Sequence, residues 1–356
     1  MKNIKLVGGG LKRKTLFEKI TCLKNLFLAW EEFKKGKTQK EDVIKFEKDY
    51  KNNIFALYKV LRNKTYCHST YFSFYVKDPK LRHIHKACVK DRVLHHAIFR
   101  ILYPIFDKSF IFDSYSCRIG KGTHRAVNRL QYFFRKVSQN NTKNCFVLKC
   151  DIKKYFDSIN HDILIDLIKR KIKDENVLWL IDVIIKSYST SLGIGIPLGN
   201  ITSQLFANIY LNELDKFIKQ DLKIKYYIRY CDDFIVLDEN REYLGSLIPK
   251  IAYFLQKNLK LSLHPNKVII QKHRQGIDFL GYVNFTNYKI LRIKTRKRMI
   301  KNLKLKLLYF NQGMTTKASF NQTVQSYLGV LKHCDAYKIK KQNINLLSPK
   351  SVLDNL

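Results

Sequence analysis

The chain has 356 residues and is 46% hydrophobic, which is enough for a large core or for two to three structural lobes. Lys and Arg number 67 against 29 Asp and Glu, and the formal net charge of +38 is costly for a compact protein unless a polyanion such as nucleic acid neutralises it. The eight cysteines are scattered without a Cys-x-x-Cys pair, and no apolar run is long enough to span a membrane. This composition excludes a disulfide framework and predicts a cytoplasmic protein with reduced thiols and no membrane partner, although an AT-rich genome would explain part of the lysine excess.

The N-terminal region predicts a basic arm followed by two amphipathic helices. Met1–Lys14 is basic and leads into no signal-peptide core, so we interpret it as a flexible arm. Apolar residues three or four positions apart predict one helix over Thr15–Phe33 and a second over Glu41–Leu61.

A β-hairpin and a helix are predicted next. Tyr71–Val76 alternates as a strand does, Asp78-Pro79 favours a turn, and Leu81–His85 returns. A helix then begins near Lys90 and runs to about Ile105.

Four histidines of this region, His83, His85, His95 and His96, suggest a metal cluster. Zinc sites usually recruit Cys, or His side chains that share one face. His95 and His96 are adjacent on the predicted helix and diverge. We therefore expect no metal there.

Two features with the character of binding sites follow. Ser114–His124 is a basic loop with glycines that precedes a helix from about Arg125, and the free N–H groups of a helix N-terminus attract phosphate. Cys145–Cys150 then predicts a buried strand, and Asp151 comes directly after it. Ligand sites gather at the carboxyl ends of strands in sheets with helical cover.

Helices are predicted over His161–Ile172 and Val177–Ser187, and a glycine-bearing loop, Gly193–Gln204, comes next. Glycines let a backbone approach a substrate closely. The apolar face that follows predicts a helix running to Leu214, with Asn200 as its N-cap.

The stretch Tyr230-Cys231-Asp232-Asp233 predicts the tip of a β-hairpin, because β-prone runs, Lys225–Arg229 and Phe234–Leu237, flank it. Two adjacent acids repel each other and add nothing to a core, but they suit divalent metal binding. Mg²⁺ prefers hard oxygen ligands, and two-metal sites for phosphoryl chemistry hold their ions about 3.5–4 Å apart. A polar turn is the alternative for this stretch taken alone. With Asp151, three carboxylates are available for two ions.

The rest of the chain is mostly helical by pattern. Glu239–Leu259 predicts a helix that Pro249 breaks or kinks. Lys294–Phe310 and Ala318–Leu331 predict two more helices, the first very basic, and the tail after Tyr337 is polar and predicted to be loose.

The acid-bearing strand and the Tyr-x-Asp-Asp hairpin resemble, in type and order, the two catalytic motifs of the palm domain of reverse transcriptases. The resemblance extends from about Tyr71 to Tyr337. It implies an α+β, right-hand polymerase fold with fingers, a palm built on an antiparallel sheet, and a helical thumb that clamps the duplex; a helical hairpin that only packs on the palm is the alternative to a thumb. We expect an N-terminal arm and helices over 1–70, fingers over 71–144 with 160–195, palm over 145–159 and 196–288, thumb over 289–337 and a polar tail over 338–356.

The resemblance implies an RNA-directed DNA polymerase, a nucleotidyltransferase that extends a DNA or RNA primer with deoxynucleoside triphosphates on an RNA template. Its cofactor would be two Mg²⁺ ions, with Mn²⁺ as a substitute. Asp151, Asp232 and Asp233 would hold them, with Ile152 beside Asp151 in the metal set; one ion activates the primer 3′-hydroxyl and the other neutralises the triphosphate. Lys267, in the stretch Leu261–Lys267, matches the lysine that the family associates with protonating the pyrophosphate leaving group.

Other positions match the family's substrate contacts. Cations of the fingers hairpin hold the triphosphate, a bulky aromatic side chain collides with a ribose 2′-hydroxyl, and a short hairpin, here Phe279–Tyr282, grips the primer end. Arg118 would contact the template backbone or brace the fingers. The nucleotide-binding candidates are Arg82, Lys90, Phe156, Gly199 and Gln204, with Lys86 and Arg92 as secondary choices, and the template and primer candidates are Arg118, Leu198, Tyr230, Leu280 and Gly281.

The loop Leu198-Gly199-Asn200-Ile201-Thr202-Ser203-Gln204 departs from the Gln-Gly-x-x-x-Ser-Pro of most related bacterial enzymes, including those of group II introns. It resembles the loop of diversity-generating retroelement enzymes, which misread template adenines and usually act with a small basic accessory protein. No maturase or endonuclease extension is expected after the thumb, which agrees with that subclass. The alternatives are a retron or phage-defence reverse transcriptase, a non-catalytic RNA-binding protein on the same fold, and a metal-dependent nuclease.

Overall fold

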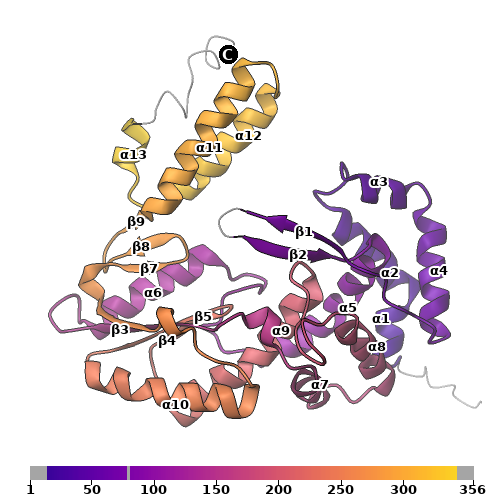
Figure 1. The fold of residues 1–356 in the computed structure, drawn as a ribbon, viewed down its shortest axis with the longest axis horizontal. Coiled ribbons are helices and arrows are strands. Elements are labelled where there is room, and N and C mark those ends of the chain that lie inside the picture. Colours follow the sequence, from indigo (N-terminus) through magenta and orange to yellow (C-terminus); the bar gives the residue numbers. More distant parts are fainter. Residues whose placement is uncertain (1–13, 78–80, 343–356) are drawn as a thin grey trace, which may run out of the picture. The chain divides into compact units, whose positions relative to one another are not determined.

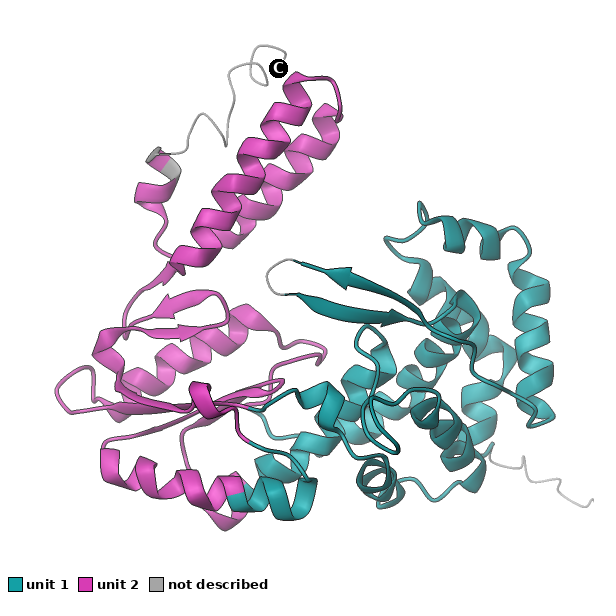
Figure 2. Ribbon diagram, viewed as in Figure 1, with its two compact units in different colours: residues 1–112, 152–217, 253–262 teal, residues 113–151, 218–252, 263–356 magenta. Residues whose placement is uncertain are grey.

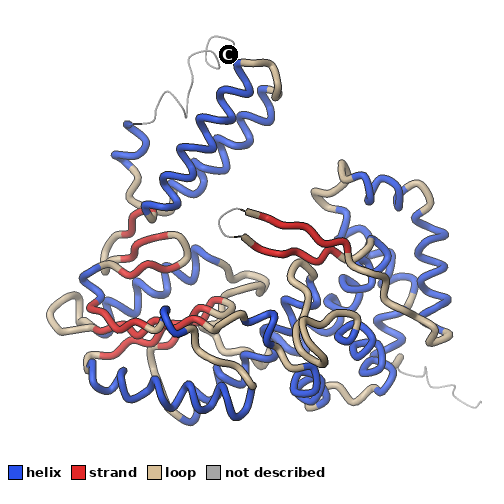
Figure 3. Tube along the Cα trace, viewed as in Figure 1, coloured by secondary structure: helices blue, strands red, loops and turns tan. Residues whose placement is uncertain are grey.

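The computed structural model describes residues 14–77 and 81–342 and combines helices with antiparallel sheets, as an α+β fold does (Figure 3). The predicted arm before residue 14, the turn at 78–80 and the tail beyond 342 lie outside the described residues. The chain divides into two compact units, each built from three separated segments of the sequence (Figure 2). Residues 1–112, 152–217 and 253–262 form the first unit, and residues 113–151, 218–252 and 263–356 form the second. The predicted division into fingers, palm and thumb stays a prediction.

The first unit is helical apart from one hairpin. Its long helix α5 packs against α2 and α9, and the hairpin β1–β2 pairs Phe72 with Lys86 and Val76 with Arg82 (Figure 1). The elements are α1 (Leu16–Thr21), α2 (Leu23–Lys34), α3 (Glu41–Glu47), α4 (Tyr50–Arg62), β1 (Phe72–Val76), β2 (Arg82–Lys86), α5 (Val89–Asp107), η1 (Tyr155–Ser158), α7 (His161–Lys169), α8 (Glu175–Lys186) and α9 (Ile201–Lys216).

The prediction of one helix over Thr15–Phe33 was wrong, because the chain is extended at Cys22, with φ −63° and ψ 146°. The amide of the buried Asn25 donates to the carbonyl of Ile20, which the break releases, at 2.8 Å, and to the carbonyl of Ala97 on α5 at 3.1 Å. The predicted helix over Glu41–Leu61 is likewise two helices, α3 and α4. An apolar period continues across such breaks and cannot locate them.

The second unit is built on a four-stranded antiparallel sheet of order β4-β5-β3-β6 and a three-stranded sheet of order β7-β8-β9. Helix α6 packs against β4, β5 and β8, and α11 packs against α12 (Figure 1). The elements are α6 (Thr123–Val137), β3 (Phe146–Asp151), β4 (Tyr227–Tyr230), β5 (Asp233–Asp238), η3 (Pro265–Lys267), β6 (Ile269–Lys272), η4 (His273–Gln275), β7 (Ile277–Phe279), β8 (Tyr282–Asn284), β9 (Lys289–Leu291), α11 (Ile293–Asn311), α12 (Lys317–Leu331) and α13 (Tyr337–Gln342).

Some elements differ from their predictions. Helix α10 (Arg241–Leu259) continues through Pro249 and crosses the boundary between the units, so of the two predicted effects of Pro249, a break or a kink, the break does not occur. The segment Phe217–Asp221, η2, continues α9 as a π-helical turn. The tail after Tyr337 begins with helix α13 and not with loose chain.

The core of the second unit lies between α6 and the larger sheet. Val147 of β3 and Ile235 of β5 are fully buried in one cluster with Leu130 and Phe134 of α6. Burial of side chains of this size stabilises by roughly 1.5–3 kcal/mol each. The strands that carry the acids are therefore held by the packing of their apolar side chains and not by the acids.

Candidate active site

Three carboxylates lie together at one end of the larger sheet. β4 and β5 form the predicted hairpin, with Tyr230 opposite Asp233 and Cys231-Asp232 as its turn. β3 pairs with β5 in a register that puts Asp151 opposite Asp233. Opposed residues of an antiparallel pair project from the same face, so Asp151 and Asp233 are neighbours. The predicted hairpin with acids at its tip is confirmed.

The three carboxylates repel one another in the absence of a bound metal ion. Burial raises the pKa of Asp233 to about 6, the charge of Lys149 lowers it, and the charges of Asp151 and Asp232 raise it. Burial and then the charge of Asp151 also raise the pKa of Asp232. Like charges placed opposite each other destabilise a sheet, so these residues are poor choices for stability alone.

Lys267 lies in contact with Asp151, with 2.7 Å between Nζ and Oδ1. The backbone holds this arrangement, because the N–H of His264 donates to the Asp151 carbonyl at 2.8 Å and the N–H of Lys267 donates to the His264 carbonyl at 3.1 Å. The sequence placed Lys267 among the catalytic residues, and its role in proton transfer stays a prediction.

Lys149 is a residue of this site that sequence reasoning missed. Its Nζ donates to the Asp278 carbonyl at 2.8 Å, and its charge acts on Asp233. A signal for it was present, because side chains two apart on a strand share a face and Lys149 precedes Asp151 by two residues.

The donor set fits Mg²⁺. All three side chains offer hard carboxylate oxygens. Burial raises the pKa values of Asp232 and Asp233, and the charge of Asp151 raises both further, so a bound cation would relieve this repulsion. The Lys267 ammonium already lies against Asp151. Within residues 14–77 and 81–342, no group of three or more His, Cys, Asp or Glu side chains is arranged to hold an ion.

We expect Asp233→Asn to raise the thermal stability of the metal-free protein at pH 7.5. The raised pKa means that ionised Asp233 destabilises the folded state, so the penalty grows as pH rises from about 4 to about 6 and is complete above it. Two pKa units correspond to roughly 3 kcal/mol, and partial exposure reduces this to about 1–2 kcal/mol.

The measurement is thermal unfolding in EDTA at pH 7.5 and at pH 4.5, where Asp233→Asn and the natural chain should converge. Asp238→Asn, at the other end of β5, is the control and should give no gain. Equal melting temperatures for the natural chain and Asp233→Asn at pH 7.5 would contradict the repulsion.

The other second-unit candidates are Leu280, Gly281, Tyr230 and Arg118. Leu280 and Gly281, with φ of 52° and 87°, form the two-residue turn between β7 and β8, so the predicted hairpin is present. The Tyr230 hydroxyl is 3.2 Å from the Thr123 hydroxyl, and Arg118 donates to the Ser114 carbonyl at 3.0 Å. Contacts with template or primer stay predictions for all four.

In the first unit, strand β2 is bound to the loop that precedes α9. The N–H of His85 donates to the Leu198 carbonyl, and the Asn200 side-chain amide donates to the His85 carbonyl, both at 3.1 Å. Asn200 stands at the N-cap position, but its side chain does not cap α9, because it is engaged with His85. Gly199 has φ +119°, and a Cβ there would lie 3.0 Å from Ile84 Cγ2, so the position favours glycine.

This loop lines a cavity of about 340 Å³ within the first unit. Asp42 pairs with Lys86, at 2.7 Å, and with Arg92, while Asn200 Oδ1 is buried without a hydrogen-bond partner. Lys37 was missed by sequence reasoning, since it lies in the turn after α2 and no pattern of its neighbours marks it. The lining residues are Phe33, Lys37, Phe74, Ile84, Lys86, Arg92, His95, His96, Gly199, Asn200, Ile201 and Gln204.

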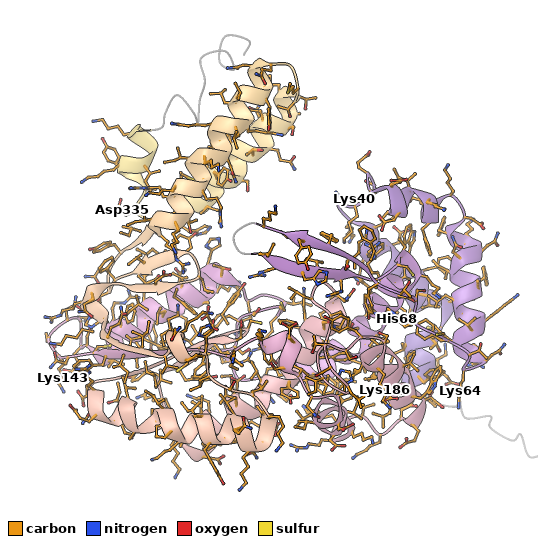
Figure 4. All side chains as sticks on the ribbon, in the orientation of Figure 1. Lys40, Lys64, His68, Lys143, Lys186 and Asp335 are labelled. Atoms are coloured by element: carbon orange, nitrogen blue, oxygen red, sulfur yellow. The ribbon has the colours of Figure 1, made fainter. Side chains whose placement is uncertain are left out.

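The histidines of this region face different neighbours. His95 Nε2 is 3.2 Å from Nε2 of His68, which Figure 4 labels, while His96 packs edge-on against Phe33. Burial lowers the pKa of His95 to about 3 and that of His96 to about 4, so both are neutral at physiological pH.

The remaining candidate residues of the first unit lie outside the cavity. Arg82 is exposed on β2, and Lys90 Nζ lies 5.6 Å from the centre of the Tyr66 ring. Ile152 is buried directly after Asp151 in the chain, and Phe156 is half-buried in η1. The first unit therefore brings Gly199 and Gln204 to one cavity with cations, whereas Arg82, Lys90, Ile152 and Phe156 do not line it.

The sequence of this chain is similar to a known protein family and to several curated proteins. Residues 76–284, more than half of the chain, match the family described as reverse transcriptase (RNA-dependent DNA polymerase). Among curated proteins, the chain is 24% identical over 241 residues to Protein YkfC of Escherichia coli, covering 57% of this chain and 63% of that protein. It is 26% identical over 273 residues to the group II intron-encoded protein LtrA of Lactococcus lactis, covering 57% and 44%.

A eukaryotic relative is the nuclear intron maturase 3, mitochondrial, of Arabidopsis thaliana, 26% identical over 256 residues, covering 61% of this chain and 34% of that protein. The chain thus spans less than two thirds of the length of each of these relatives. None of the described helices is long and apolar enough to cross a membrane. On the match over residues 76–284, the chain belongs to the reverse transcriptase (RNA-dependent DNA polymerase) family and has the right-hand polymerase fold that this family implies.

Proposed function

We propose that the chain is an RNA-directed DNA polymerase that extends a primer with deoxynucleoside triphosphates on an RNA template. The observation that carries the proposal is the register of β3 and β5, which opposes Asp151 to Asp233 with Asp232 in the adjoining turn. Carboxylates gathered in this way at the end of a buried sheet have a use in phosphoryl transfer and none in folding. Membership of the family supports the same chemistry.

Asp151, Asp232 and Asp233 would hold two Mg²⁺ ions, or Mn²⁺ in their place. When bound, the ions would supply activation of the primer 3′-hydroxyl and neutralisation of triphosphate charge. Asp151 would exchange its contact with Lys267 for a metal contact, which frees the Lys267 ammonium. Lys267 Nζ could then donate its proton to the departing pyrophosphate. The backbone carbonyl of Ile152 is the further oxygen proposed for this set.

The first unit supplies most of the proposed contacts with the incoming nucleotide. Its cavity is lined by Lys37, Lys86 and Arg92 and by no Asp or Glu of the described residues, and Asp42 pairs with two of these cations, so the local charge favours phosphate. Gly199 and Gln204 border the same space. We assign the incoming nucleotide to Arg82, Lys90, Phe156, Gly199 and Gln204, and the template and primer to Arg118, Leu198, Tyr230, Leu280 and Gly281.

The test is primer extension by the purified chain on matched RNA and DNA templates, with Mg²⁺ or with EDTA. Magnesium-dependent synthesis on RNA is the expected result. Tight RNA binding without incorporation would instead identify a non-catalytic RNA-binding protein, and cleavage of the RNA strand would identify a nuclease. Either outcome would overturn the proposal.

The finer proposal is that the chain belongs to a diversity-generating retroelement and acts with a small basic accessory protein. Leu198-Gly199 in place of Gln-Gly supports this, and similarity to a group II intron-encoded protein agrees with the broader lineage. A retron or phage-defence enzyme is the alternative. A pair of nearly identical repeats beside the gene that differ at adenines would support the retroelement.

Leu198→Gln is expected to lower the error rate a few-fold to about tenfold, chiefly opposite template adenine. The Leu198 carbonyl is engaged with His85, so the substitution changes only the half-buried side chain. A glutamine amide would add a hydrogen bond near the nascent base pair, worth roughly 0.5–1.5 kcal/mol, and mismatches would then leave a polar group unpaired.

The measurement is misincorporation opposite each template base, with Leu198→Met as the control because it keeps an apolar side chain of similar size. An unchanged error spectrum in an active Leu198→Gln enzyme would remove Leu198 from the fidelity argument.

A further inference from the structure

The turn that carries the two adjacent acids has an unfavourable backbone. Cys231 has φ +57°, a region that L-residues other than Asn and Asp seldom adopt. The next two residues, Asp232 and Asp233, are both carboxylates, and Asp233 lies opposite the third acid, Asp151. Repulsion between them and strain at Cys231 both favour opening of the turn, so other contacts must hold it.

Arg229 supplies such a contact from within β4. Its side chain is 1% exposed and is among the largest fully buried side chains of the described chain. Its Nη1 donates to the Cys231 carbonyl at 3.0 Å, and its Nη2 donates to the Ser114 hydroxyl at 3.1 Å. One planar guanidinium therefore bridges the turn to a separate segment of the chain.

That segment is itself fixed along the free edge of the sheet, where β4 is the outer strand. The N–H of Arg229 donates to the Asp113 carbonyl at 2.9 Å, and the N–H of Tyr115 donates to the Arg229 carbonyl at 3.0 Å, which forms a parallel bridge between Ser114 and Arg229. Arg129 holds the Asp113 carboxylate with two bonds of 2.8 and 3.1 Å.

We propose that Arg229 is a positioning residue that holds the Cys231-Asp232 turn in the one conformation that presents Asp232 and Asp233 to the metal ions. This proposal rests on the proposed polymerase function. Arginine suits the role because its rigid fork spans two acceptors at once, whereas lysine presents a single point charge on a flexible stem. Loss of the bridge would leave the acids present but poorly oriented.

The test compares Arg229→Lys with the matched control Arg129→Lys, which weakens the same edge segment without touching the turn. For Arg229→Lys we expect kcat to fall about tenfold to a hundredfold, since a displacement of about 1 Å at reacting groups has effects of this size. The Mg²⁺ concentration for half-maximal extension should rise several-fold, while the KM for nucleotide and the Kd for primer–template stay unchanged. Arg129→Lys should lose thermal stability and keep kcat and the Mg²⁺ dependence.

A second readout separates this proposal from the polymerase function itself. Binding of Mn²⁺, followed by its electron paramagnetic resonance signal, should weaken in Arg229→Lys and stay unchanged in Arg129→Lys, whether or not the chain extends primers. Ser114→Ala removes the hydroxyl that accepts from Arg229 Nη2 and should show the same changes at smaller magnitude. It replaces Arg229→Lys in the test if that variant does not fold. The positioning role is overturned if Arg229→Lys keeps the Mn²⁺ affinity and the kcat per folded molecule of the unsubstituted chain. It is also overturned if both quantities fall equally in Arg229→Lys and Arg129→Lys.

Discussion

Asp232→Ala is expected to abolish primer extension, with a loss of at least about a thousandfold, or about 4 kcal/mol of transition-state stabilisation. Asp232 lies in the turn between β4 and β5, next to the opposed pair Asp151 and Asp233. Without the Asp232 charge, only two of the three proposed carboxylate ligands remain to hold the two metal ions. Because the loss concerns the transferring phosphoryl group and not the duplex, binding of primer–template should remain nearly intact.

The measurement is single-nucleotide extension together with RNA binding, in the natural chain and in the variant. Asp232→Asn keeps the side-chain shape and should lose nearly as much, which separates the effect of charge from that of packing. Asp151→Ala should be as severe as Asp232→Ala, and Asp233→Ala less so. Asp238→Ala, an acid at the opposite end of β5, is the control and should extend primers normally. Undiminished incorporation by Asp232→Ala would exclude this acid from the active site.

Phe156→Ala is expected to admit ribonucleotides, with discrimination against them falling roughly 5- to 150-fold, since forcing a group into filled space costs about 1–3 kcal/mol. Phe156 is half-buried in η1, and its ring meets that of Tyr155 edge to face with 5.5 Å between centres. Its carbonyl accepts the N–H of Ile196 at 2.9 Å, so the backbone beneath the ring is held in place. A fixed ring of this kind can exclude a 2′-hydroxyl by steric contact.

Competition between matched deoxy- and ribonucleoside triphosphates in single-nucleotide extension measures this effect. Phe156→Tyr keeps the ring and should keep the discrimination, so it is the matched control. If Phe156→Ala discriminates as the natural chain does, the ring belongs to the core and another residue selects the sugar.

Local patterns were sufficient for most single elements. The apolar run that ends on Asp151 and the two runs that flank Tyr230–Asp233 predicted β3, β4 and β5, because period and composition act over a few residues. Longer helices were less well defined. Beside the break at Cys22, the amide of Asn25 bonds to the carbonyl of Ala97, a residue 72 positions away that no local pattern includes.

The strand that ends in an acid, the hairpin with two acids at its tip and the large excess of cations could all be predicted from the sequence, since each is a property of neighbouring residues or of composition. The register that opposes Asp151 to Asp233, the contact of Lys267 with Asp151 and the burial of Arg229 with its bond to the Cys231 carbonyl arise only in the folded chain. Lys267 and Asp151 stand 116 positions apart, and Arg229 and Ser114 stand 115 apart. Contacts at such separations form only when the free energy of core packing exceeds the entropic cost of closing the intervening chain. A local sequence pattern contains no information about either quantity.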